Sequence, residues 1–252
     1  MGPSRRAAAV ALAAAGTLTG CSLLVRPSTL TMDVLHDDRA CTAQAPVLLV
    51  LLPGAHMTPQ EIVREGFVAA VRQRRLAADV AVAGAHLGYV QDGSVLRRLH
   101  ADVIAPAQEQ GYRRIWLAGI SLGGFLAMGY SLRHPEAIEG IVTLAPYLGR
   151  QPLVRAIADA GGPAAWHGTT QPRDAADFDH ELRSWLAAPP PGAPPVYLGY
   201  GSDDRFAQGH RLMATTLPAG RVDTAAGGHD WPPWRALWAR WLDRGLLPLG
   251  CA

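Results

Sequence analysis

The stretch LAGISLGGFLAMGY, residues 117–130, places Ser121 between a glycine two positions before it and another two positions after it. An apolar run, RIWLAG at 114–119, leads into this turn, and a segment rich in Leu, Ala and Met follows it. The pattern predicts a strand, a tight turn and a helix, because larger residues beside the serine would clash in so sharp a turn. Ser121 would then lie at a helix N-terminus, where backbone amides favour negative charge. It is either a nucleophile or an ordinary helix-capping serine, and the preceding strand favours the nucleophile.

Short apolar runs alternate with amphipathic stretches from residue 46 onward. The runs are apolar almost throughout, which is typical of strands that are covered on both faces of a parallel sheet. The expected strands are residues 46–52, 79–84, 114–119, 138–145, 195–201 and 221–227, with 28–36 as an antiparallel edge strand.

The stretches between these runs predict helices. The first, TPQEIVREGFVAAVRQRR at 58–75, begins with a capping box formed by Thr58 and Glu61, with Pro59 at the first helical position. The other expected helices are residues 94–109, 122–133, 207–216 and 231–243. The alternation predicts an α/β protein with a doubly wound, mostly parallel sheet. Residues 150–194 interrupt it and end in a Pro-rich stretch, so we expect a small cap or insertion there.

With a strand before GISLG and a helix after it, the chain resembles the α/β-hydrolase family over residues 46–245. In that family an acid and then a histidine follow the nucleophile along the chain. The resemblance implies that Asp204, three positions after Gly201, is the acid, with Asp203 as the alternative. It implies that His229, in AAGGHDWPPW, is the base. His210, and His167 and His180 in the insertion, lie at other points of the topology and are interpreted as solvated or substrate-lining.

The family's oxyanion hole takes one donor from the amide after the nucleophile, which here is Leu122. The other donor lies in the loop after the first central strand, here LLPGAHMTP. Members of the family often have His-Gly at this point, whereas this chain has Pro53-Gly54. The resemblance therefore implies Ala55 as the second donor, with His56 as the neighbouring alternative.

These residues together imply a serine hydrolase that cleaves a carboxylic ester through an acyl-enzyme intermediate. A thioesterase or acyltransferase would use the same triad, and a binding lipoprotein of this fold without catalysis is an alternative from another class. Residues 85–93 are expected to form a loop at the cleft, with His86 and Tyr89 as candidate substrate contacts. Four tryptophans are candidates for pocket lining or for the core: Trp166, Trp185, Trp231 and Trp234.

Composition narrows the function classes. The chain has 252 residues, enough for one well-buried domain, and it contains no lysine, which excludes P-loop, Schiff-base and Ser-Lys chemistry. Its 23 basic residues include Arg5 and Arg6, which lie in an expected leader, and without these two the body has 21 basic and 21 acidic residues. No basic stripe of a nucleic-acid binder and no metal-binding motif is found, so we expect a small-molecule substrate and neither metal nor cofactor.

The N-terminus, MGPSRRAAAVALAAAGTLTGCSLL, has two arginines, a short apolar run and the sequence LTGC. It resembles a bacterial lipoprotein signal, which implies a signal peptide at 1–20, lipidation of Cys21 and a tether at 21–32 before a hydrolase domain at 33–252. Ser22 favours the outer membrane, so the expected location is periplasmic and lipid-anchored. Cys41 and Cys251 remain, and in an oxidising compartment they are a candidate disulfide pair.

Overall fold

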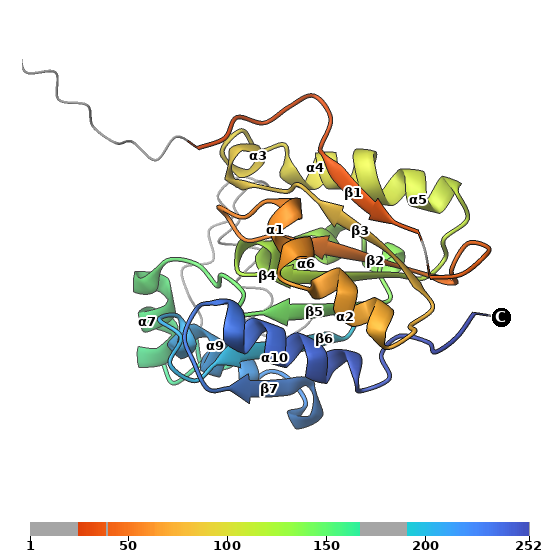
Figure 1. Ribbon diagram of the computed structural model, residues 1–252. Coiled ribbons are helices and arrows are strands. Elements are labelled where there is room, and N and C mark those ends of the chain that lie inside the picture. Colours follow the sequence, from red (N-terminus) through yellow and green to blue (C-terminus); the bar gives the residue numbers. More distant parts are fainter. Residues whose placement is uncertain (1–24, 39, 167–190, 252) are drawn as a thin grey trace, which may run out of the picture.

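The computed structural model describes residues 25–38, 40–166 and 191–251. Its centre is a seven-stranded sheet of order β1-β3-β2-β4-β5-β6-β7, in which β1 is antiparallel to β3 and every other pair is parallel (Figure 1). The strands are β1 (Val34–Asp37), β2 (Val47–Leu52), β3 (Ala78–Ala83), β4 (Ile115–Ile120), β5 (Gly140–Leu144), β6 (Val196–Gly201) and β7 (Val222–Ala225). The predicted fold class is confirmed, although the edge strand is shorter than the predicted 28–36.

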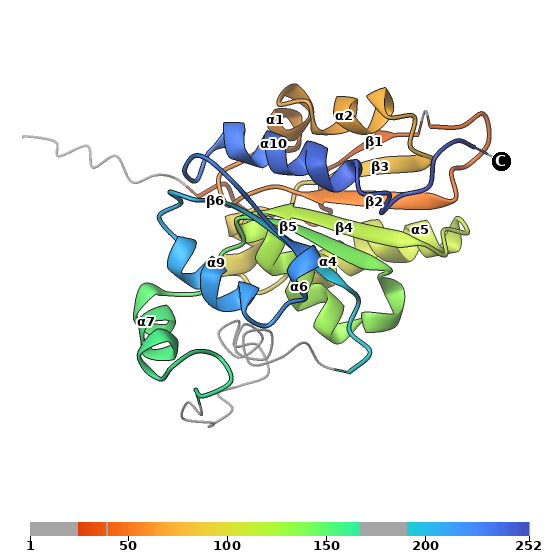
Figure 2. The same cartoon turned by 90° about the horizontal axis from the view of Figure 1, so that it is seen from below.

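Helices cover both faces of this sheet. The helices are α1 (Pro59–Arg64), α2 (Phe67–Gln73), α3 (Leu87–Gln91), α4 (Val95–Leu99), α5 (Ala105–Glu109), α6 (Leu122–Arg133), α7 (Gln151–Asp159), α9 (Ala207–Ala214) and α10 (Trp231–Leu242). One face carries α1, α2 and α10, and the other carries α4, α5 and α6 (Figures 1 and 2). Because both faces are covered, every residue of β2, β3 and β4 is buried, which explains their near-continuous apolar sequences.

Two predicted helices are interrupted. The helix expected at 58–75 is divided into α1 and α2 by Gly66, whose φ of 85° ends the first helix and starts the second. The helix expected at 94–109 consists of α4, a wider π-type turn at His100–Ile104, and α5. Pro106 follows that turn and has no N–H to donate to the carbonyl of Asp102, so a regular α-helical ladder cannot continue there.

The prediction of a loop at 85–93 was wrong, because α3 lies within it. His86 caps this helix, and its Nδ1 accepts a hydrogen bond from the Gly88 amide at 3.1 Å. In the insertion expected at 150–194 the structure contains α7. His167, His180 and Trp185 lie outside the described residues, as do residues 1–24 with Cys21. Among the described helices, none is both long and apolar enough to cross a membrane.

Cys41 and Cys251 form a disulfide across a sequence separation of 210 residues. The tail that carries Cys251 also bonds to the segment between α2 and β3. The Ala77 amide donates to the Pro248 carbonyl at 2.8 Å, and the Gly250 amide donates to the Arg75 carbonyl at 3.2 Å. These contacts hold the C-terminus beside the segment that precedes β3.

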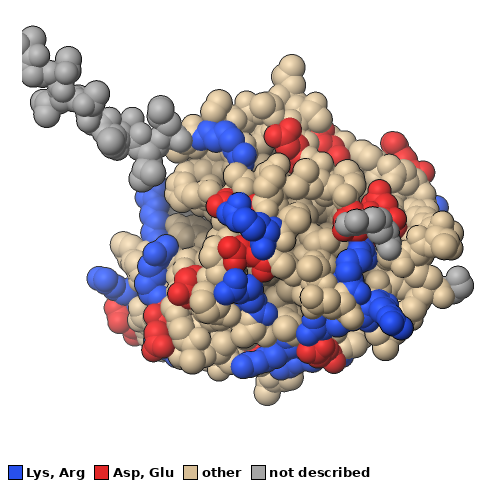
Figure 3. Space-filling model, viewed as in Figure 1, with Lys and Arg blue, Asp and Glu red and all other residues tan. Residues whose placement is uncertain are grey.

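Arginines and acidic side chains are interspersed on the face shown in Figure 3. Arginine and acidic side chains also pair across elements, for example Arg74 with Asp243 at 2.6 Å and Arg235 with Glu65 at 2.8 Å. The mixture agrees with the near-neutral composition of the body of the chain.

Candidate active site

The carboxyl ends of the six parallel strands meet at one edge of the sheet, where ligands of open α/β sheets bind. Three loops at this edge bring together the predicted site residues. Ser121 follows β4, residues 202–206 follow β6, and residues 226–230 follow β7. The loop 53–58, which follows β2, lies at the same edge.

The backbone at Ser121 is strained in the way that a sharp strand-to-helix turn requires. Its φ of 51° and ψ of −112° lie outside the regions that most residues adopt. A Cβ at Gly119 would come within 2.2 Å of the Gly123 carbonyl, and a Cβ at Gly123 within 2.0 Å of the Leu52 carbonyl oxygen. The Ser121 amide donates to the Leu144 carbonyl at 2.9 Å and anchors the turn to β5. Glycine is therefore required on both sides of the serine.

Ser121, His229 and Asp204 form one hydrogen-bonded chain. His229 Nδ1 lies 2.8 Å from Asp204 Oδ2, and His229 Nε2 lies 3.0 Å from Ser121 Oγ. Because a carboxylate only accepts, Nδ1–H donates to Asp204, which leaves Nε2 to accept the Ser121 hydroxyl. The arrangement is that of a serine nucleophile, a base and an orienting acid.

The surroundings of Asp204 keep its carboxylate charged. Its side chain is 0% exposed, and burial raises its pKa, but the hydrogen bonds from His229 and from the Phe206 amide lower the pKa more, so that the net shift is downward. Asp203, the alternative, is exposed and accepts a hydrogen bond from Ser202 Oγ instead. Of the two aspartates, Asp204 is therefore the one that contacts His229.

Two aromatic rings pack against the imidazole of His229. Phe206 and Trp234 contact it edge-on, with ring centroids at 5.1 and 5.0 Å. Only 8% of the His229 side chain is exposed, so its orientation is fixed by packing as well as by hydrogen bonds. Trp234 is itself 3% exposed and belongs to the core.

His210 lies outside the hydrogen-bonded chain of Ser121, His229 and Asp204. It is fully buried, and its Nε2–H donates to the Pro146 carbonyl at 2.9 Å. Burial lowers its pKa to about 4, although the Pro146 carbonyl and Asp204 act in the opposite direction. The ring therefore stays neutral near pH 7, and its hydrogen bond joins α9 to the loop after β5. The prediction that His210 is solvated or lines a substrate site was wrong.

The two amides expected as oxyanion donors lie on neighbouring segments. Leu122 is the first residue of α6, and Ala55 lies in a turn closed by the Met57 amide and the Gly54 carbonyl at 3.1 Å. Within the described residues, neither the Leu122 nor the Ala55 amide donates to an acceptor. Gly123 packs against the Leu52 and Pro53 carbonyls, so the loop that carries Ala55 lies against the serine turn. His56, the alternative donor, follows in the same loop.

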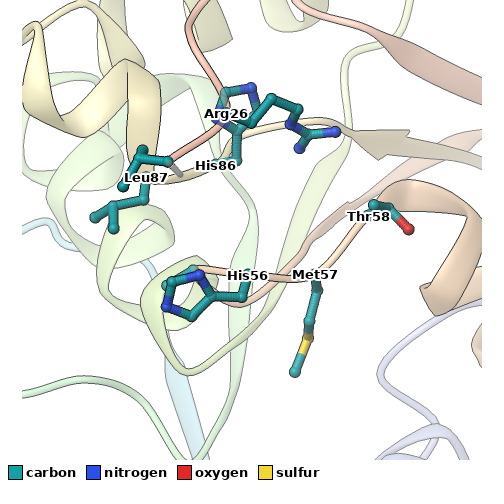
Figure 4. A pocket seen from close by; sticks show the side chains of 8 residues that line it. Arg26, His56, Met57, Thr58, His86 and Leu87 are labelled. Carbon is teal, nitrogen blue, oxygen red and sulfur yellow. The ribbon is translucent and has the colours of Figure 1, made fainter. Parts of the chain in front are cut away.

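A cavity of about 200 Å³ lies beside Ala55 (Figure 4). It is lined by Val25, Arg26, Ala55, His56, Met57, Thr58, His86 and Leu87. Of the two predicted substrate contacts, His86 lines it and Tyr89 does not. Tyr89 lies on α3 with its ring turned into the protein, where it is 1% exposed. Its hydroxyl lies 2.6 Å from Thr29 Oγ1 and so contacts the segment before β1. Sequence reasoning missed Arg26, which lies in the segment interpreted as a tether.

In the parts of the chain that the structure describes, no three His, Cys, Asp or Glu side chains come together in a group that could hold a metal ion.

A family model described as serine aminopeptidase, S33, matches residues 84–173. No curated protein sequence matches the chain.

Solved structures match over most of the chain. Fluorophosphonate-binding serine hydrolase F (FphF) of Staphylococcus aureus is 14% identical, with a TM-score of 0.60 over 85% of this chain and 98% of that one. A monoacylglycerol lipase of Paleococcus ferrophilus is 17% identical, with a TM-score of 0.55 over 84% of this chain and 98% of that one. A ferulic acid esterase is 14% identical, with a TM-score of 0.53 over 84% and 97%. The chain has the α/β-hydrolase fold.

Proposed function

We propose that this protein is a serine hydrolase that cleaves a carboxylic ester through an acyl-enzyme. The observation that carries the proposal is the hydrogen-bonded chain from Ser121 through His229 to Asp204, with separations of 3.0 and 2.8 Å. The similarity to solved esterases and lipases supports the fold on which such a site is built.

In the first half-reaction, His229 Nε2 takes the proton of the Ser121 hydroxyl as Oγ attacks the ester carbonyl carbon. The carbonyl oxygen becomes an oxyanion, which accepts hydrogen bonds from the Leu122 and Ala55 amides. His229 then passes the proton to the leaving alcohol oxygen as the C–O bond breaks, and Asp204 stabilises the imidazolium in between. Water then attacks the acyl carbon as His229 Nε2 takes its proton. The imidazolium passes that proton to Ser121 Oγ as the bond between Oγ and the acyl carbon breaks, and the acid product leaves.

The proposal is tested by initial rates on a panel of 4-nitrophenyl esters of increasing acyl length, with the matching thioesters and an aminoacyl 4-nitroanilide as separate arms. We expect ester hydrolysis by the purified protein, and a loss of at least a thousandfold in kcat/KM for Ser121→Ala. Ser94→Ala is the control serine and is expected to retain full activity. Faster cleavage of the thioesters or of the anilide would show that the bond cleaved is a thioester or an amide and not an ester. Activity retained by Ser121→Ala would refute the proposal.

We also propose that the mature chain begins at Cys21, carries lipid there, and is anchored in the outer membrane facing the periplasm. The support is the order of arginines, apolar run and LTGC in the sequence. Intact-mass measurement of protein extracted from membranes is expected to show removal of residues 1–20 and the mass of a lipidated cysteine. A Cys21→Ser variant would remain unprocessed or soluble, and an unlipidated wild-type chain would contradict the proposal.

A further inference from the structure

We propose that the cavity beside Ala55 is a subsite for a negatively charged group on the substrate, with Arg26 supplying the positive charge. The inference rests on the proposed ester hydrolysis and names a substrate class for it: esters whose acyl or alcohol part carries an anionic group such as a carboxylate. Ala55 lines the cavity and is also a candidate oxyanion donor, so a group in the cavity can belong to the ester that is being cleaved.

The lining of the cavity is one-sided in charge. Arg26, His56 and His86 contribute cationic or N–H-bearing groups, and none of the lining residues is acidic. Figure 4 shows Arg26 and His86 on one side of the cavity and His56 and Met57 on the other. Arg26 forms no ion pair with any described residue. A guanidinium that lies at the wall of a cavity and has no carboxylate partner can bind an anionic ligand by donating hydrogen bonds to it.

His86 adds a hydrogen-bond donor to the same wall. Its Nδ1 accepts from the Gly88 amide at 3.1 Å, so in the neutral ring the proton is on Nε2. Burial and the charge of Arg26 lower its pKa, whereas Asp33 and Asp92 act against this shift from outside the lining. The ring is therefore neutral near pH 7, and within the described part of the chain nothing accepts its Nε2–H.

The wall that carries Arg26 is fixed to the domain. Thr29 Oγ1 lies 2.6 Å from the Tyr89 hydroxyl, and the Met32 amide donates to Asp102 Oδ2 at 2.8 Å. Gly88 allows the closest approach, because a Cβ there would lie 2.1 Å from the Arg26 carbonyl oxygen. The position of Arg26 thus follows from contacts with α3 and its neighbours, and the segment expected to be only a tether forms part of the candidate site.

Two pairs of esters test the proposal, each pair differing only in charge. The first is 4-carboxyphenyl butyrate against 4-carbamoylphenyl butyrate, which places the charge on the alcohol side. The second is the mono(4-nitrophenyl) ester of adipic acid against 4-nitrophenyl hexanoate, which places it on the acyl side. We expect the ratio of kcat/KM, anionic over neutral, to be about ten in one pair, and to fall as salt is raised because Arg26 is exposed.

Arg26→Gln is expected to reduce that ratio to about one. Arg113→Gln is the matched control, since Arg113 is exposed and precedes β4 at the opposite edge of the sheet, and it should keep the wild-type ratio. A wild-type ratio near one in both pairs, or an unchanged ratio in Arg26→Gln, overturns this inference while leaving ester hydrolysis intact. If the wild-type protein cleaves none of the four esters and Ser121 is not labelled by a fluorophosphonate, the proposed function fails and this inference fails with it.

Gly88→Ala tests the wall without removing a polar side chain, and the added Cβ would also lie 3.0 Å from Cε1 of the His86 ring. The added methyl group would push the Arg26 carbonyl away, so the charge preference should fall as it does in Arg26→Gln. Gly220→Ala, where a Cβ meets nothing within 4 Å, is the control and should keep the wild-type ratio. A full preference in a folded Gly88→Ala protein would contradict the proposal that the position of Arg26 sets it.

Discussion

The carboxylate of Asp204 accepts two hydrogen bonds, from His229 Nδ1 at 2.8 Å and from the Phe206 amide at 2.8 Å. A buried carboxylate needs such partners, because an unpaired charge away from water costs several kcal/mol. Asp203, one position earlier, faces solvent. These contacts favour Asp204 over Asp203 as the acid, a choice that residue spacing alone left open.

Asp204→Asn keeps the shape of the side chain but offers an amide where His229 needs an acceptor. We expect kcat to fall about a thousandfold or more, because the imidazole then adopts the wrong tautomer to accept the Ser121 proton. Asp203→Asn should remain within about twofold of wild type in the same ester assay. The reverse order of the two variants would show that Asp203 is the acid.

Ala55→Pro removes the one backbone N–H that the loop after β2 is proposed to offer to the oxyanion. Loss of one such donor typically lowers kcat by about 10²–10³, and we expect a drop of that size with KM little changed. Ala55→Gly retains the N–H and serves as control, and circular dichroism checks that both variants fold. A larger loss in His56→Pro than in Ala55→Pro would move the donor to His56.

At the scale of elements, the turn between β4 and α6 depends on two close backbone approaches. Gly123→Ala would place a methyl group 2.0 Å from the Leu52 carbonyl oxygen, so β2 and α6 must move apart. We expect a loss of about 1–3 kcal/mol in unfolding free energy, measured by urea denaturation, together with a loss of ester hydrolysis. Gly220→Ala is the control, and wild-type stability in Gly123→Ala would contradict the packing described for this turn.

The strands could be predicted well because β2, β3 and β4 are buried on both faces and carry almost no polar residues. The break at Gly66 was missed because the apolar helical pattern continues on both sides of it, and a single glycine inside a helix costs only about 1 kcal/mol. The helix α3 has five residues, too few to show a period. Arg26 was missed because its position depends on contact with Gly88, far along the chain, which no local pattern records.

At the scale of the whole molecule, the burial of His210 makes the free energy of unfolding depend on pH. The unfolded chain binds a proton on this side chain that the folded state does not. His210 has an ordinary pKa of 6.5 in the unfolded chain and a pKa lowered by burial to about 4 in the folded one. Between these values the unfolded state holds more protons, so stability is fully present above pH 6.5 and is lost as the pH falls toward 4. The contribution of this one side chain is about 3 kcal/mol over that window.

His210→Gln, which retains an N–H donor for the Pro146 carbonyl, should therefore flatten the fall in unfolding free energy between pH 6.5 and 4. Urea denaturation at a series of pH values measures it, and the slopes of the two proteins are compared. His36→Gln, at an exposed histidine, should keep the wild-type slope. Equal slopes in His210→Gln and wild type would show that His210 is not the group responsible.

The disulfide between Cys41 and Cys251 closes almost the whole domain into one loop. Removing it enlarges the conformational freedom of the unfolded chain, and we expect the double variant Cys41→Ser, Cys251→Ser to lose about 2–4 kcal/mol of unfolding free energy. A reductant should lower the Tm of the wild-type protein and leave that of the double variant unchanged. A wild-type Tm insensitive to full reduction would contradict this role of the disulfide.

The nucleophilic role of Ser121 is tested most directly by mapping the covalent adduct of a fluorophosphonate. The purified protein is incubated with the probe and digested, and the modified peptide is sequenced by mass spectrometry. We predict a single adduct on Ser121 in the peptide containing GISLGG, lost in Ser121→Ala and strongly slowed in His229→Ala. Equal labelling of all three proteins, or an adduct on another residue, would contradict the nucleophilic role of Ser121.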